Sequence, residues 1–163
     1  MIVDPDTLIK DFIDSFNRHS NIKIQRNMIS HNLLKAPHMP PSLPKGKCAV
    51  YIFSLAANSR CPAGQNRVLK VGKVGSNSAA RFQYQHYKRG SARSTLAGAI
   101  ESNKILWDYL GIKDNITDFG DWLKNHTDRD NYFLDGKYYE IVSELEVYLK
   151  GILGPVFEGS NRS

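Results

Sequence analysis

Two short apolar segments constrain the fold of this chain most. The first is Lys47–Phe53, and the second, Lys70–Gly75, follows it after a polar stretch rich in loop-forming residues. Each is apolar enough to form a buried strand, and the loop at 58–66 suits an antiparallel hairpin. Such a hairpin would bring Tyr51, the lysines of the second segment and the later Arg81 to one place.

The rest of the pattern predicts helices around a small sheet. Apolar residues recur at helical spacing in five segments: 7–18, 78–88, 94–110, 117–125 and Tyr139–Leu153. A third strand is expected at Asp130–Leu134. Asp6 is the expected cap of the first helix, Ile105 should be buried by the third, and Gly154 should end the last. We therefore expect an α/β fold in which a small, mainly antiparallel sheet of three strands is flanked by helices.

A proline-rich connector divides the chain. The stretch Ala36–Lys47 contains four prolines and Gly46, so it should be extended. We expect residues 1–45 to form an N-terminal helical arm with this connector, and residues 46–163 to form the main domain. A homodimer held together by this arm is an alternative that the sequence neither requires nor excludes.

Other features of the sequence exclude several classes of protein. The 163 residues suffice for one core, and no apolar stretch approaches the roughly 18–20 residues of a membrane span. The N-terminus has no basic region followed by an apolar one, so we expect a cytoplasmic protein without a signal peptide. Cys48 and Cys61 lack zinc-site spacing and are expected to be reduced thiols.

Positive charge is concentrated in the middle of the chain. The segment 45–104 has eleven basic residues and one acidic residue, Glu101, giving +10; the remainder has eleven basic and fifteen acidic residues, giving −4. Such a one-signed region attracts a polyanion, and the binding should weaken with salt. A solvated basic surface without a partner is the alternative.

The order of these residues resembles the GIY-YIG nuclease family. The family's first motif is similar to Ala49-Val50-Tyr51, its second to Lys70-Val71-Gly72, its helix arginine to Arg81, and its late glutamate and proline to Glu146 and Pro155. The resemblance covers about residues 46–158. Lysine in place of the second motif's tyrosine resembles a branch that includes some restriction endonucleases. Glu158 stands where the family usually has asparagine, and His86 lies one position beyond the family's usual histidine.

The resemblance implies the roles of the site residues. Tyr51 would act as general base or orient the attacking water, with Lys70 favouring its phenolate. Arg81 would bind the scissile phosphate, with His86 nearby. Glu146 would hold one Mg²⁺ or Mn²⁺ ion that serves the leaving oxygen.

A second group of residues is expected to contact DNA. Lys88 and Arg89 would bind phosphates and Tyr87 would stack on a base, while Lys73 is either a DNA contact or the true partner of Tyr51. These features predict a divalent-metal-dependent DNA endonuclease in restriction, phage defence or a mobile element. The alternative is a basic DNA-binding module that has the nuclease fold without cleavage.

Overall fold

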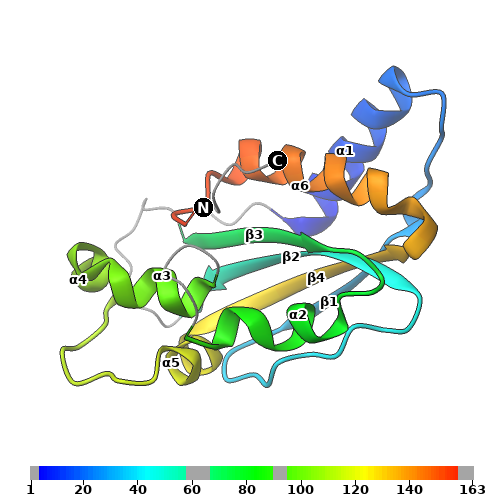
Figure 1. Cartoon of the computed structure of the whole chain (residues 1–163). Helices are drawn as coiled ribbons and strands as arrows, with labels where there is room; N and C mark the ends of the chain where they lie inside the picture. The colour runs from blue at the N-terminus through cyan, green and yellow to red at the C-terminus, as the bar shows by residue number, and fades with distance from the viewer. Residues whose placement is uncertain (1–3, 58–66, 90–94, 158–163) are drawn as a thin grey trace.

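The computed structural model describes residues 4–57, 67–89 and 95–157. Its centre is one antiparallel sheet of four strands in the order β1-β4-β2-β3 (Figure 1). The strands are β1 (Ser30–Leu34), β2 (Lys47–Leu55), β3 (Val68–Val74) and β4 (Thr127–Asp135). The expected loop at 58–66, Cys61 and Glu158 lie outside the described residues.

The α/β class and the antiparallel sheet are confirmed, but the expected number of three strands is wrong. The fourth strand, β1, pairs along its whole length with β4, from Ser30 opposite Phe133 to Leu34 opposite Arg129. Its side chains are exposed or half-buried. Because this edge strand buries neither face, its sequence lacks the alternation that marks a strand, and backbone pairing fixes it instead.

β2 is the central strand of the sheet, with β3 on one side and β4 on the other. Its side chains alternate between the two faces, and both faces are covered. Tyr51 and Phe53 pack into one core, whereas Val50 and Ile52 pack into the other. A central strand between two cores explains why this segment is apolar without interruption.

Helices cover both faces of the sheet (Figure 1). α1 (Pro5–His19) and α6 (Tyr139–Leu153) lie over the face of Val50, while α2 (Ala79–Tyr84), α3 (Leu96–Ser102) and α5 (Phe119–His126) lie over the face of Tyr51. The bounds of α6 agree with the prediction. Gly154 ends it in the left-handed region, with φ of +54°, where glycine carries no Cβ penalty.

Two predicted helices are shorter than expected. The segment 78–88 forms α2 and then the 3₁₀ turn Gln85–Tyr87, and the segment 94–110 is divided into α3, a 3₁₀ turn and α4 (Trp107–Leu110). This division leaves Ile105, which was expected to be buried, 91% exposed. Trp107 donates its indole N–H to the carbonyl of Ile100 at 2.8 Å, which helps to satisfy the end of α3 where the helix stops.

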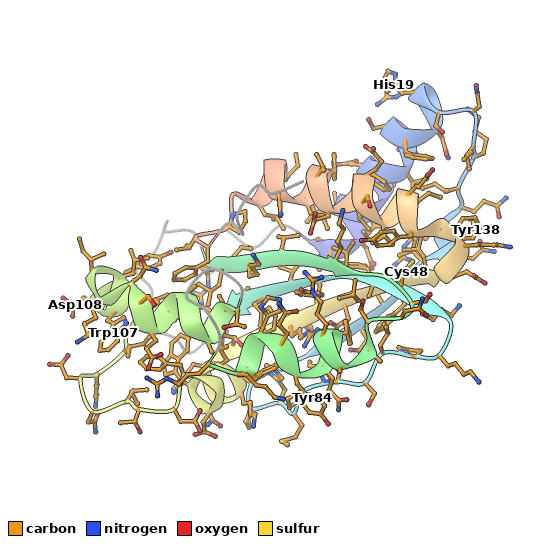
Figure 2. All side chains as sticks on the ribbon, viewed as in Figure 1. His19, Cys48, Tyr84, Trp107, Asp108 and Tyr138 are labelled. Atoms are coloured by element: carbon orange, nitrogen blue, oxygen red, sulfur yellow. The ribbon has the colours of Figure 1, made fainter. Side chains whose placement is uncertain are left out.

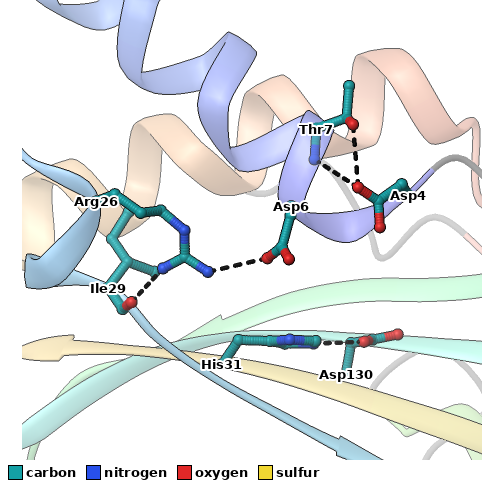
Figure 3. Close-up of polar contacts among 7 residues, drawn as sticks. All are labelled: Asp4, Asp6, Thr7, Arg26, Ile29, His31 and Asp130. Atoms are coloured by element: carbon teal, nitrogen blue, oxygen red, sulfur yellow. Dashed lines mark hydrogen bonds and ion pairs between the residues drawn. The ribbon is translucent and has the colours of Figure 1, made fainter.

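The cap of α1 also differs from the prediction. The carboxylate of Asp4, and not that of Asp6, accepts the backbone N–H of Thr7 at 3.1 Å. Pro5 then occupies the first helical position, where its missing N–H costs nothing. Asp6 instead pairs with Arg26 at 3.1 Å (Figure 3).

The N-terminal segment packs with the rest of the described chain. His31 of β1 lies 2.6 Å from a carboxylate oxygen of Asp130 of β4 (Figure 3). The connector buries His38 and Leu43. Leu43 packs into the same core as Tyr51 and Phe53 of β2. Within the described ranges, no helix has the length and apolar character needed to cross a membrane.

Candidate active site

Tyr51 lies in the middle of β2, and its ring extends over the neighbouring strand. It stands opposite Gly72 of β3. A Cβ built on Gly72 would lie 2.5 Å from both Cζ and Oη of the tyrosine, closer than atoms can approach. A residue other than glycine at position 72 would therefore displace the ring. Tyr51 is only 2% exposed.

His86 donates a hydrogen bond to the Tyr51 hydroxyl. Its Nε2 lies 2.6 Å from Oη, and its Nδ1 accepts the backbone N–H of Leu96, the first residue of α3, at 3.0 Å. Burial lowers the pKa of His86 to about 3, so the imidazole is neutral at physiological pH. A neutral imidazole that accepts at Nδ1 carries its proton on Nε2, and this proton points at the phenol oxygen.

The Tyr51 phenol is protonated at neutral pH. Burial raises its pKa to about 12, while the charges of Arg129 and Arg81 lower it and that of Glu146 raises it. Among the residues that the structure describes, none accepts the phenol's own proton, and the hydroxyl is hydrogen-bonded to the donor His86. A hydroxyl oxygen that accepts a hydrogen bond from an N–H group is stabilised in the phenolate state, because that hydrogen bond strengthens when the oxygen becomes negative.

Arg129 was not predicted from the sequence. It lies on β4 opposite Phe53, on the face of Tyr51, and is fully buried. Its guanidinium carbon is 4.9 Å from the ring centroid of Tyr51 and 4.3 Å from that of Phe82. The predicted strand began one residue later, at Asp130. A strand that began one residue earlier would have placed Arg129 on the inward face. The polar residues on either side of it in the sequence gave no sign of this burial.

Lys70 and Arg81 lie on the same side of the sheet as the tyrosine. Lys70 stands opposite Phe53 on β3, and Arg81 is exposed on α2. The charge of Lys70 lowers the pKa of His86, and Arg81 acts on both His86 and Tyr51. The cations that lower the pKa of Tyr51 are thus Arg129 and Arg81, whereas Lys70 had been expected in this role.

Glu146 approaches β3 from the opposite face of the sheet. Lys73 stands opposite Val50 and therefore faces α6. Its Nζ lies 3.9 Å from Oε1 of Glu146 and donates to Oγ of Ser143 at 3.1 Å. Lys150 Nζ lies 3.7 Å from the same oxygen of Glu146. Lys73 is therefore a neighbour of the glutamate and lies on the face of the sheet away from Tyr51.

Glu146 offers one carboxylate to a hard cation, and two lysines already contact it. In the described ranges, no three His, Cys, Asp or Glu side chains gather in a way that could hold a metal ion. Mg²⁺ commonly uses one or two carboxylates and completes its shell with water and substrate phosphate. Glu146 can supply one carboxylate, provided that the ammonium groups of Lys73 and Lys150 move away from it.

The residues predicted to contact DNA differ in their availability. Tyr87 is 8% exposed, so its ring presents no face to a base. Tyr84 of α2 is 45% exposed and points outward (Figure 2), and Nζ of Lys88 lies 5.2 Å from its ring centroid. Arg89 is exposed but pairs with Glu101 at 2.8 Å. Tyr84 and Lys88 are thus better placed than Tyr87 to meet a nucleic acid.

The site therefore consists of a buried tyrosine held by a neutral histidine, two arginines that act on its charge, and a glutamate on the far side of the edge strand. Tyr51 contacts both His86 and Arg129. A scan against protein-family models and searches of curated proteins and of solved structures found no match to this chain.

Proposed function

We propose that this protein is a divalent-metal-dependent endonuclease that hydrolyses DNA phosphodiester bonds, in restriction, phage defence or a mobile element. One observation carries the proposal. The Tyr51 hydroxyl receives the N–H of His86 and lies where the charges of Arg81, Arg129 and Glu146 all act on it. The sequence resemblance requires a phenol, a phosphate-binding arginine and a carboxylate, and the charges of Arg81 and Glu146 both act on the phenol although Glu146 lies across the edge strand.

The chemistry assigns a task to each side chain. Hydrolysis of a phosphodiester needs an oriented water, neutralised phosphoryl oxygens and a stabilised leaving oxygen. Tyr51 would orient the water and, in its phenolate form, receive the water's proton at Oη to become the neutral phenol, while His86 holds that oxygen. Arg81, exposed on α2, would bind two phosphate oxygens with its planar guanidinium. Glu146 would hold Mg²⁺ or Mn²⁺, which when bound supplies positive charge to the leaving oxygen.

This assignment sets the pH dependence. Because the pKa of Tyr51 is about 12, the phenolate fraction grows tenfold for each unit of pH below that value. Cleavage limited by this group should rise with pH into the alkaline range. His86 should add no inflection near neutral pH, because its pKa is about 3.

A plasmid-cleavage assay tests the proposal. Purified protein is incubated with supercoiled DNA in Mg²⁺ or in EDTA, and nicked and linear products are separated on a gel. We expect cleavage in Mg²⁺ alone, and its loss in Glu146→Gln, which keeps the size of the side chain but removes its charge. Glu144→Gln is the matched control, since Glu144 is an exposed carboxylate on the same helix. Full cleavage in EDTA, or by Glu146→Gln, would contradict the proposed metal site.

A binding module without cleavage is the second candidate. Two observations favour it: Tyr51 is nearly inaccessible to solvent, and the carboxylate of Glu146 is already contacted by Lys73 and Lys150. DNA binding measured by fluorescence anisotropy at several salt concentrations, together with the plasmid assay, separates the two. Salt-dependent binding with no cleavage in Mg²⁺ or Mn²⁺ would favour the module.

A further inference from the structure

Arg129 is a buried cation without a carboxylate partner. It is 0% exposed, and within the described part of the chain no Asp or Glu lies within ion-pair distance of it. Its sequence neighbours Asp128 and Asp130 alternate to the other face, where they bind the backbone N–H of Ala36 and the ring of His31. Burial of an unpaired charge costs free energy, so the buried guanidinium of Arg129 indicates a role other than stabilising the fold.

Aromatic rings and neutral acceptors surround the guanidinium. Four rings lie within 5.8 Å of its carbon, those of Tyr51, Phe53, Phe82 and Tyr87. The carbonyl of Phe82 accepts from it at 2.8 Å and Oδ1 of Asn131 at 2.9 Å. These groups hold the cation in place without cancelling its charge. The positive charge is therefore available to any neighbour that becomes negative.

Two tyrosines are in reach of that charge, and their histidines distinguish them. The Tyr87 hydroxyl oxygen accepts a hydrogen bond from the guanidinium at 3.3 Å, but its own proton faces Nε2 of His38, whose Nδ1 donates to the carbonyl of Thr127. Neutral His38 is therefore an acceptor, and the Tyr87 proton is bonded to it. Tyr51 instead receives the N–H of His86, which leaves its oxygen ready to carry charge.

We propose that Arg129 is a positioning residue whose uncancelled charge favours the ionised form of Tyr51. This inference rests on the proposed nuclease function, in which Tyr51 takes a proton from water. Arg129 contacts the ring of the tyrosine and not the reacting atoms, so it acts through Tyr51. A guanidinium held by aromatic rings serves this role better than a surface lysine, since water and salt screen it little.

Asn131→Asp tests the proposal without removing Arg129. Asn131 accepts from the guanidinium Nε, so an aspartate of the same shape would give Arg129 the carboxylate that it lacks. The amide of Asn32, which now accepts from Asn131 at 3.1 Å, can rotate to donate to the new carboxylate. The fold should be retained, while the charge that acts on Tyr51 is cancelled. Asn131→Ala is the control that loses the same hydrogen bond without adding charge.

The readout is the ionisation of Tyr51 itself. Fluorotyrosine is incorporated, which lowers phenol pKa values into a range where the protein stays folded, and the Tyr51 signal is followed by fluorine NMR and assigned by its loss in Tyr51→Phe. Asn131→Asp should raise the pKa by about one unit or more, and cleavage should fall about tenfold and recover at a pH about one unit higher. Asn131→Ala should leave the titration close to that of the wild type.

Arg129→Met provides a second measurement, because it removes the charge outright. It should shift the Tyr51 titration in the same direction as Asn131→Asp. If Arg129→Met does not fold, Asn131→Asp decides alone. An unchanged titration in folded Asn131→Asp would overturn the proposal. A shifted titration in protein that cuts no DNA would leave the electrostatic role intact and remove the nuclease function instead.

Discussion

Two tyrosine–histidine pairs lie beside the buried Arg129, and the hydrogen bonds within the two pairs have opposite donors. Tyr51 and His86 are joined at 2.6 Å, and Tyr87 and His38 at 2.7 Å. Both tyrosine rings lie within 5.8 Å of the guanidinium carbon. In the first pair the histidine donates to the phenol, and in the second the phenol donates to the histidine.

The difference comes from the backbone and not from the residue types. The second nitrogen of His86 meets an N–H at the start of α3, whereas that of His38 meets a carbonyl at the start of β4. A backbone N–H can only donate and a carbonyl can only accept, so each fixes the tautomer of its histidine. The same two residue types thus give the proton of Tyr87 an acceptor in His38, whereas His86 offers the Tyr51 oxygen a donor.

Replacing each phenol by phenylalanine is the strongest test of this contrast. Tyr51→Phe should lower the cleavage rate roughly 10²–10⁴-fold, as for the loss of a general base. Tyr87→Phe should retain cleavage within about tenfold, although it should cost about 1–3 kcal/mol of stability by leaving buried polar groups unpaired. Rates on plasmid DNA and thermal unfolding of both variants provide the comparison. Equal losses of activity in the two variants would show that cleavage does not depend on whether the histidine donates to the phenol or accepts from it.

A glycine beside Tyr51 sharpens the comparison through packing. Gly72→Ala would place a Cβ 2.5 Å from the phenol, so we expect displacement of the ring and a loss of about 1–3 kcal/mol, as for other overpacked sites. Gly75→Ala, whose Cβ would lie 3.8 Å from the ring of Tyr139, is the control and should be nearly neutral. Chemical denaturation measures both. A stable Gly72→Ala variant that keeps the fluorine signal of wild-type Tyr51 would mean that the ring has room to spare.

Much of the scaffold could be predicted from the sequence, because β2 and α6 bury long apolar faces whose periodicity is visible. β1 could not, since it is held by backbone pairing and buries little. Tyr51 and His86 were identified as candidates, but their contact depends on where a 3₁₀ turn ends and α3 begins. Arg129 was not predicted as a site residue, because charged residues in a polar run are usually solvated. Its burial depends on the register of β4 against β2.

At mildly acidic pH, the smallest expected effect concerns stability and again separates the two histidines. The folded pKa of His86 is about 3, below the ordinary value of 6.5, so the unfolded chain binds a proton first as the pH falls. The resulting stability is complete above pH about 6.5 and decreases towards pH about 3, by about 1.4 kcal/mol at pH about 5.5. His86→Gln should flatten this decrease in a pH series of denaturant titrations. The pKa of His38 is also lowered, but its bond to the Thr127 carbonyl opposes the shift, so His38→Gln should flatten the curve less. The reverse order would mean that His86 is protonated in the folded protein and does not hold Tyr51 as a neutral donor.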